Sequence, residues 1–350
     1  MTRKALTPTT IALSAAATLV LWIVSAALGL SSGSSALGGF DLVSCYFTGE
    51  LSATEEAILW SARLPRVVFA GVVGAALAAG GAVFQAVLRN PLADPYILGV
   101  SGGAALGGTL LLTLGSFSVG VLAVGTPLAA FAGALAALAA IFSVARWAPG
   151  GRGATYVLLL TGVIVNAFAA SMIMFLQSVV SAQKAQEILF YLMGSLSVEG
   201  TAWPTMVGVS AVILLSLVAL FAFARDLNAL SLGDEEAAYL GVEVVKVQRI
   251  CLLLSSLAVA VGVAFSGIIG FVGLVVPHAM RLVVGPDHRV LLPTSALAGA
   301  AFLTLADVSA RSLFGVLGTT LPVGVLTSMI GAPLFLYFLW RALRRDAGWA

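Results

Sequence analysis

Uncharged or nearly uncharged stretches of about 20 residues recur along the chain, separated by short polar segments. A helix needs about 20 apolar residues to cross a bilayer. Gly, Ala, Leu and Val dominate these stretches, whereas strands of a membrane barrel alternate apolar and polar residues in pieces of about ten. The pattern therefore predicts an all-α, polytopic membrane protein. The ten predicted spans are 11–30, 67–88, 96–114, 121–145, 154–178, 203–224, 250–268, 271–284, 290–308 and 322–340.

Composition agrees with this pattern and excludes a soluble protein. The 350 residues are 60% hydrophobic and 9% charged, with a mean hydropathy of +1.09, whereas roughly 25% of the residues in a soluble domain are charged. Arg3 and Lys4 precede the first apolar run as in a secretory signal. The run is long for such a signal, so we expect it to remain as the first span.

The two cysteines lie far apart in the sequence: Cys45 is in a loop and Cys251 is in a span. We therefore expect neither a disulfide framework nor a metal cluster.

Lys and Arg are unevenly distributed when the amino terminus is placed in the cytoplasm. Cytoplasmic loops of membrane proteins carry an excess of these residues, and ten spans put 13 of the 17 on that side. The distribution predicts that both termini are cytoplasmic. The 13 are Arg3, Lys4, Arg89, Arg146, Arg152, Arg225, Lys246, Arg249, Arg281, Arg289, Arg341, Arg344 and Arg345.

Lys184 and three arginines run against this rule. Arg63 and Arg66 stand where the second span begins, and Arg311 stands where the ninth ends, all at the predicted outer face. Their side chains could reach lipid headgroups or form a docking site for an acidic partner. Arg311 could instead pair with Asp307, which lies four residues earlier on the same helix face. The sequence leaves these interpretations open.

Small residues recur at four-residue spacing within two of the spans. Small faces allow helix backbones to approach one another closely in a membrane. We therefore predict tight helix packing at both sets, which says nothing about the cargo. The two sets are Gly71, Ala75 and Ala79, and Gly99, Gly103 and Gly107.

The polar segment 225–249 joins the sixth and seventh spans on the cytoplasmic side. Three acids at 234–236 favour a helix amino terminus, where the helix dipole stabilises negative charge. Gly241 is placed to end that helix. The pattern predicts two short helices, separated at Gly233, that lie along the membrane face; an ordinary solvated loop is the alternative.

Placing a polar side chain within a membrane span costs free energy, so such residues are often functional. The candidates are Gln85, Asn166, Gln177, His278 and Asp307. Asn166 lies in the middle of the fifth span, where it either lines a path or forms a hydrogen bond to another helix. For His278 a structural role is favoured over metal or haem ligation, because no partner ligand is near it in sequence.

Several longer motifs occur in a fixed order from about residue 60 to the end of the chain. With these motifs the sequence resembles the FecCD-type permeases, the membrane subunits of ABC importers for iron-siderophores, haem and cobalamin. The motifs are Arg-Leu-Pro-Arg at 63–66 with 74–78, Asn-Pro-Leu-Ala-Asp-Pro at 90–95 with 98–104, Gly-Asp-Glu-Glu-Ala-Ala at 233–238 with 240–242, and 270–278 through 321–324 and 331–333.

The resemblance implies a type II ABC importer permease architecture of about ten helices. It implies one permease domain over residues 1–350, with coupling helices at 227–245, in a bacterial inner membrane. Two copies would form a homodimer around a central path. A cytoplasmic ABC ATPase and a periplasmic substrate-binding protein would be the partners.

The resemblance also implies roles for individual residues. Arg63, Arg66 and Arg311 match outward arginines that dock the binding protein. Asn90, Leu92 and Thr155 match the cytoplasmic gate, although Tyr156 departs from the small hydroxyl residue that a cobalamin member has there. Asn166 lies in the helix that lines the path. The residues that match the ATPase-coupling loop are Leu232, Gly233, Asp234, Glu235, Glu236, Ala237, Ala238, Leu240 and Gly241.

These observations predict a permease that imports an iron chelate, a siderophore or haem, with a cobalamin importer of the same family as the alternative. A stand-alone secondary transporter is less consistent, since such proteins place charges at mid-membrane sites and these spans hold almost none. The chain contains no Gly-x-x-x-x-Gly-Lys-Ser/Thr phosphate loop. We therefore expect a non-enzyme without a cofactor or metal, and no nucleic-acid partner.

Overall fold

The computed structural model describes residues 8–31, 52–96, 98–114, 122–145, 147, 152–197, 203–313, 318–319 and 321–347. All regular elements within these ranges are helices. Seven of them are long and apolar enough to cross a membrane, and three shorter apolar helices accompany them. Each of the ten predicted spans has its helix, so the all-α, polytopic prediction is confirmed. The ten are α1 (Pro8–Ser31), α4 (Leu64–Val87), α5 (Val100–Leu114), α6 (Leu122–Ala145), α7 (Arg152–Val179), α9 (Trp203–Ala222), α12 (Val244–Ser266), α13 (Val272–Val284), α14 (His288–Ser312) and α16 (Val323–Ala347).

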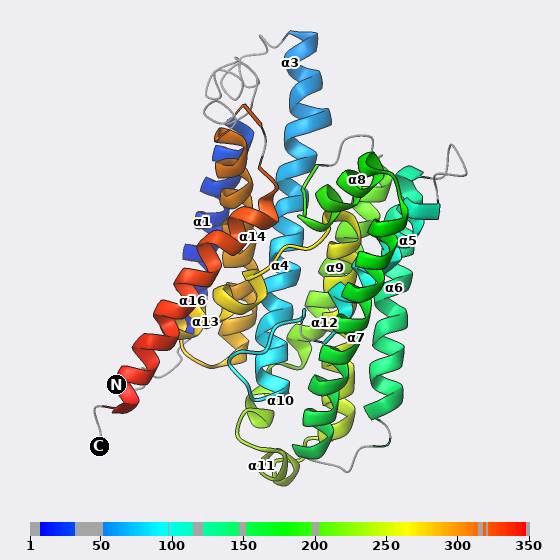
Figure 1. Ribbon diagram of the computed structural model, residues 1–350. Coiled ribbons are helices and arrows are strands. Elements are labelled where there is room, and N and C mark those ends of the chain that lie inside the picture. The colour runs from blue at the N-terminus through cyan, green and yellow to red at the C-terminus, as the bar shows by residue number, and fades with distance from the viewer. Residues whose placement is uncertain are drawn as a thin grey trace.

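The helices form one bundle with two distinct ends (Figure 1). The lower end in Figure 1 carries the short helices α10 (Ala224–Leu230) and α11 (Asp234–Tyr239), and we call it the α11 end. The opposite end carries α8 (Ala182–Leu192), and we call it the α8 end. Burial places α4 at the centre, with 89% of its apolar window covered, whereas α1 and α7 have only 11% and 17% covered and lie at the periphery.

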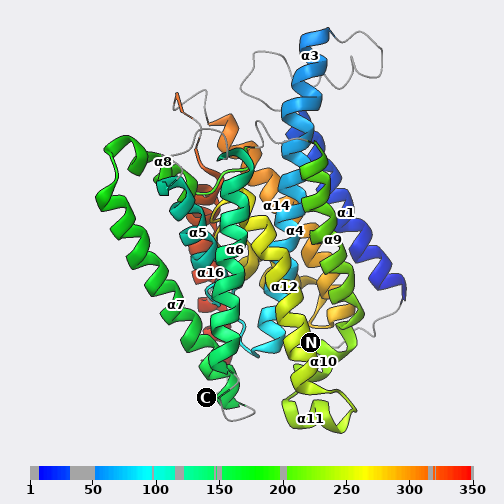
Figure 2. The ribbon, with the colours of Figure 1, turned by 90° about the vertical axis from the view of Figure 1, so that its right-hand side faces the viewer.

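The second span is longer than its apolar pattern predicted. α3 (Ala53–Ile58), a π-helical stretch η1 (Leu59–Arg63) and α4 form one continuous helix of 35 residues that projects beyond the bundle at the α8 end (Figure 2). Ser52 and Glu55 form a capping box at its start: the Glu55 amide donates to Ser52 Oγ at 3.3 Å, and the Ser52 amide donates to Glu55 Oε2 at 2.8 Å. This cap satisfies two amides that a helix end leaves free. Arg63 therefore lies inside a helix rather than at its edge.

Tight packing at the glycines is confirmed between α5 and α6. A Cβ atom on Gly107 would lie 2.1 Å from the carbonyl oxygen of Ala129, and one on Gly103 would lie 2.5 Å from that of Gly133. Only glycine allows backbones to come this close. Gly99 differs, because it precedes α5 with a φ of +76° and faces Val165 of α7.

The chain breaks sharply between α12 and α13, at the boundary between the predicted spans 250–268 and 271–284. Gly267 and Phe271 flank it with φ angles of +68° each. The short α13 then packs directly on α4, where a Cβ on Gly81 would lie 1.8 Å from the Gly273 carbonyl oxygen. The break also meets other parts of the chain, since the Ser195 amide donates to the Ser266 carbonyl at 2.7 Å. The tertiary structure thus places residues 267–271 at a junction inside the bundle.

Candidate functional site

The two short helices predicted in segment 225–249 are present as α10 and α11. Gly233 separates them with a φ of +151°, a backbone conformation that side chains disfavour. Asp234, Glu235 and Glu236 occupy the first turn of α11, where the dipole favours acids. The helix ends at Tyr239, and Gly241 follows with a φ of +85°.

α11 presents an exposed surface of apolar and acidic side chains at the lowest point of the molecule (Figure 2). Tyr239 is 91% exposed, whereas Ala237 is fully buried and anchors the helix to the core. Exposed apolar groups of this kind mark interaction sites. We call the set the coupling surface, after the ATPase-coupling role that stays a prediction, and it consists of Leu232, Glu235, Glu236, Tyr239 and Leu240.

Asp234 attaches α11 to the rest of the bundle. Arg89 Nη2 donates to Asp234 Oδ2 at 2.9 Å, and Gln248 Nε2 of α12 donates to Asp234 Oδ1 at 3.1 Å. Both members of the ion pair are about one-quarter exposed. The sequence marked Asp234 as an acid at a helix start within the predicted coupling loop, and Arg89 as a cytoplasmic cation, but it did not predict that they pair.

α10 is attached elsewhere, to the start of α14. Asn228 Nδ2 donates to Asp287 Oδ1 at 2.8 Å, and the backbone amide of His288 donates to Asn228 Oδ1 at 2.8 Å. Hydrogen bonds from Arg289 hold the pKa of Asp287 well below its usual range, which keeps this carboxylate charged. Sequence reasoning missed Asn228, because its partners lie about 60 residues away.

The predicted gate residues Asn90 and Leu92 lie in the turn that follows α4. Asn90 Oδ1 accepts the Leu92 amide at 2.9 Å, and the Asn90 carbonyl accepts the Ala93 amide at 3.0 Å. We call residues 90–92 the gate turn, after the role that the resemblance implies, and that role stays a prediction. The Leu92 side chain is 43% exposed. The Thr155 side chain lies outside the described part of the chain, and its neighbour Tyr156 is 68% exposed.

Asn166 forms a hydrogen bond to another part of the bundle, which was one of the two roles considered for it. Its Nδ2 donates to the Tyr96 carbonyl at 2.7 Å and ties α7 to the segment between α4 and α5. The Tyr96 hydroxyl in turn donates to the Ile269 carbonyl at 2.6 Å and accepts the Ile269 amide at 3.0 Å. Tyr96 therefore joins three parts of the bundle, a role for which the sequence offered no signal. A path-lining role for Asn166 stays a prediction.

Asp94 is buried in the same segment between α4 and α5. Its Oδ1 accepts the Tyr96 amide at 2.8 Å, but burial dominates and raises the pKa of Asp94 to about 6. The buried charged carboxylate therefore lowers the free energy of unfolding, whereas the neutral acid does not. This loss of stability is absent below about pH 4, the pKa of the unfolded chain, and reaches its full size above pH 6.

Asp94→Asn should accordingly stabilise the protein at pH 7.5, because the neutral amide keeps the acceptor and removes the buried charge. The pKa difference corresponds to roughly 3 kcal/mol in the free energy of unfolding. Thermal unfolding in detergent at pH 7.5 and pH 4 measures it. The advantage should disappear at pH 4, and an equal advantage at both pH values would contradict the assignment.

Two of the three arginines that broke the charge rule share a single carboxylate near the α8 end, and the third binds a backbone carbonyl. Arg66 Nη2 lies 2.8 Å from Asp307 Oδ1, and Arg311 Nε lies 3.0 Å from Asp307 Oδ2. Arg63 Nη1 donates to the Leu30 carbonyl of α1 at 2.7 Å. The predicted pair of Arg311 with Asp307 is confirmed.

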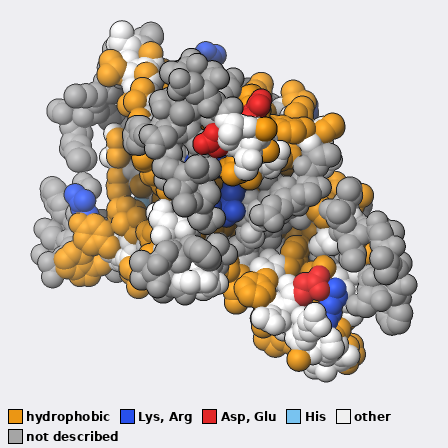
Figure 3. All heavy atoms as spheres, turned by 90° about the horizontal axis from the view of Figure 1, so that it is seen from above, with side chains coloured by type: hydrophobic (Ala, Val, Ile, Leu, Met, Phe, Trp, Pro, Cys, Tyr) orange, Lys and Arg blue, Asp and Glu red, His pale blue; other side chains and the backbone are white. Residues whose placement is uncertain are grey.

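These arginines are less exposed than a docking role suggested. Arg63 and Arg311 are buried, whereas the Arg66 side chain is 23% exposed. Seen from the α8 end, the described charged side chains form a few separate spots among hydrophobic ones (Figure 3). Docking stays a prediction, and Arg66 is the member of the set that a partner reaches most easily.

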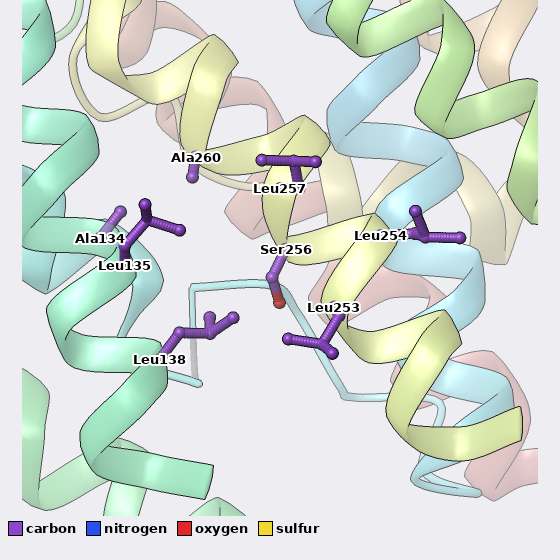
Figure 4. Close-up of a pocket in the computed structure, with 8 residues that line it drawn as sticks. All are labelled: Ala134, Leu135, Leu138, Leu253, Leu254, Ser256, Leu257 and Ala260. Atoms are coloured by element: carbon purple, nitrogen blue, oxygen red, sulfur yellow. The ribbon is translucent and has the colours of Figure 1, made fainter. Parts of the chain in front are cut away.

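An apolar crevice lies between α6 and α12 (Figure 4). Leu135 and Leu138 face Leu253 and Leu257 across it, and Ser256 supplies the polar atom of its lining. Such a lining suits hydrocarbon and offers no set of groups to bind a chelate. His278 packs against Phe335 and Phe338, with ring centroids 6.3 and 5.5 Å away. The described residues contain no group of three His, Cys, Asp or Glu side chains placed to hold a metal.

Comparisons with known proteins lead to one family. Residues 18–341 match the model of the FecCD transport family. The chain is 46% identical over 286 residues to the cobalamin import system permease protein of Halobacterium salinarum, across 82% of this chain and 74% of that relative. It is 42% identical over 320 residues to the hemin transport system permease protein of Yersinia pestis, across 90% and 92%. A solved inward-facing structure assigned to the metal-chelate type of ABC transporter matches with a TM-score of 0.79 and 32% identity, over 94% of this chain and 99% of that one.

Proposed function

We propose that this chain, which belongs to the FecCD transport family of ABC importer permeases, imports an iron chelate across the bacterial inner membrane. Two of its relatives are named for cobalamin and hemin, which are both bulky metal chelates. Within this class, a ferric siderophore or haem is the proposed cargo. Cobalamin is the second candidate, because the chain is also 46% identical to a cobalamin permease.

The coupling surface is the observation that supports an ATP-driven mechanism most directly. Two apolar side chains, Tyr239 and Leu240, are more than half exposed beside Glu235 and Glu236. An ATPase subunit with an apolar cleft and basic rim would cover the apolar groups and match the acids. We place ATP hydrolysis on that partner. The α11 end is then cytoplasmic, as are both chain termini.

The opposite end suits a periplasmic binding protein that delivers the cargo. Arg66 is the proposed contact, since an accessible cation attracts acidic groups on a partner. Two copies of the chain would enclose the path. The bundles would rock between states, with ATP supplying the free-energy difference.

Reconstitution into proteoliposomes tests the function. With the cognate ATPase and binding protein, ATP should drive accumulation of the cargo, and a panel of ferric siderophore, hemin and cobalamin identifies which one. Vesicles with the chain but without the ATPase should accumulate none of them. Accumulation without the ATPase would identify a secondary transporter and overturn the proposal.

A further inference from the structure

The backbone at Arg89 adopts a conformation that glycine usually supplies. α4 ends with the Asn90 amide donating to the Gln85 carbonyl at 3.2 Å and the Arg89 amide donating to the Ala86 carbonyl at 3.2 Å. This is the helix-ending motif whose left-handed residue is most often glycine. Arg89 occupies that position with a φ of +47°. A residue with a Cβ atom is strained there, so folding alone would favour glycine.

The side chain of Arg89 reaches α11. Arg89 Nη2 binds Asp234, the first residue of α11, at 2.9 Å. Asp234 is 145 residues further along the chain. Gln248 holds the second oxygen of the same carboxylate, so Asp234 is fixed relative to both α4 and α12.

The gate turn begins at the next residue. Its two hydrogen bonds, from the Leu92 amide to Asn90 Oδ1 and from the Ala93 amide to the Asn90 carbonyl, brace residues 90–92 as a unit. A shift of Arg89 therefore carries Leu92 with it. α10 is tied in addition to the segment before α14, through the hydrogen bond from Asn228 to Asp287.

We propose that Arg89 is a positioning residue that transmits the movement of α11 to the gate turn through its ion pair with Asp234. This inference rests on the proposed function, in which an ATPase moves the coupling surface. The left-handed backbone of Arg89 and its ion pair with the distant Asp234 are two separate observations on one residue. Together they connect the surface that receives the ATPase to the side chain of Leu92.

The test uses the assembled complex of this chain with its ATPase in lipid nanodiscs. Leu92→Cys, in a background with Cys45→Ala and Cys251→Ala, is labelled with a maleimide with and without a non-hydrolysable ATP analogue. We expect the nucleotide to change the labelling rate, since couplings of this kind alter an equilibrium by roughly 5- to 150-fold. Arg89→Gly should remove that change. Its melting temperature should be unchanged or about 2 °C higher, because glycine relieves the backbone strain.

A double-mutant cycle separates a transmitting pair from two independent effects. Asp234→Ala should reduce the nucleotide response as Arg89→Gly does, and the double variant should be no worse than either alone. Lys246→Ala is the matched control: it removes the exposed ion pair with Glu243 but keeps the pair between Arg89 and Asp234, and it should leave the response intact. A response that survives in Arg89→Gly, or losses that add in the double variant, would overturn the proposal. Failure of the unaltered chain to capture an ATPase would instead remove the proposed function and this inference with it.

Discussion

Replacing Glu235 and Glu236 with Lys is expected to abolish ATP-driven uptake. Both acids are exposed in the first turn of α11, so the double change reverses the charge of the coupling surface. The local cost is small, since a charge near a helix terminus contributes about 0.3–1 kcal/mol. Repulsion of a basic partner surface is the larger effect, because like charges brought together at an interface cost several kcal/mol.

Two measurements on this variant locate the defect. Co-purification of the ATPase should be lost, and ATP-dependent accumulation in proteoliposomes should fall to the level of vesicles without ATPase. Glu187→Lys is the control, because Glu187 is an exposed acid in α8 at the opposite end of the bundle. It should leave capture of the ATPase unchanged. Normal uptake by the Glu235→Lys, Glu236→Lys variant would show that α11 does not receive the ATPase.

Asp307→Ala is expected to cause the largest loss of stability. The Asp307 side chain is 2% exposed and compensates both Arg66 and Arg311. Its removal leaves two guanidinium groups facing each other in a buried site. Breaking a buried ion pair in this way costs about 3–5 kcal/mol in the free energy of unfolding. Thermal unfolding in nanodiscs should show a melting temperature several degrees lower, together with poor membrane yield.

Arg66→Gln is the matched control for this cluster. It removes the most accessible cation but keeps the pair between Arg311 and Asp307, so its loss of stability should be much smaller. The same variant also tests docking. If Arg66 binds the binding protein, its replacement should weaken capture most at low salt, where exposed charges are least screened. Equal capture by variant and parent across salt concentrations would assign Arg66 to structure alone. An unchanged melting temperature in Asp307→Ala would contradict the buried cluster.

The sequence by itself determined the membrane class, the ten apolar helices and the two short helices around Gly233. These are local properties, because a helix in lipid satisfies its backbone hydrogen bonds within its own segment. The boundary between the predicted spans 250–268 and 271–284 also coincides with the interval between α12 and α13, although the sharp break itself was not predicted. The start of α3 was missed, even though Ser52 and Glu55 carry the spacing of a capping box.

Only the tertiary structure decided which polar groups meet. Arg66 and Asp307 are 241 residues apart, Tyr96 and Ile269 are 173 apart, and Arg89 and Asp234 are 145 apart. Local patterns of charge and hydropathy carry no information on such pairs, because each partner satisfies its own helix equally well in many arrangements. Packing of the bundle selects one arrangement, since a polar group left unpaired in an apolar interior costs free energy. The same packing turned the arginines at 63 and 311 from expected surface groups into buried ones.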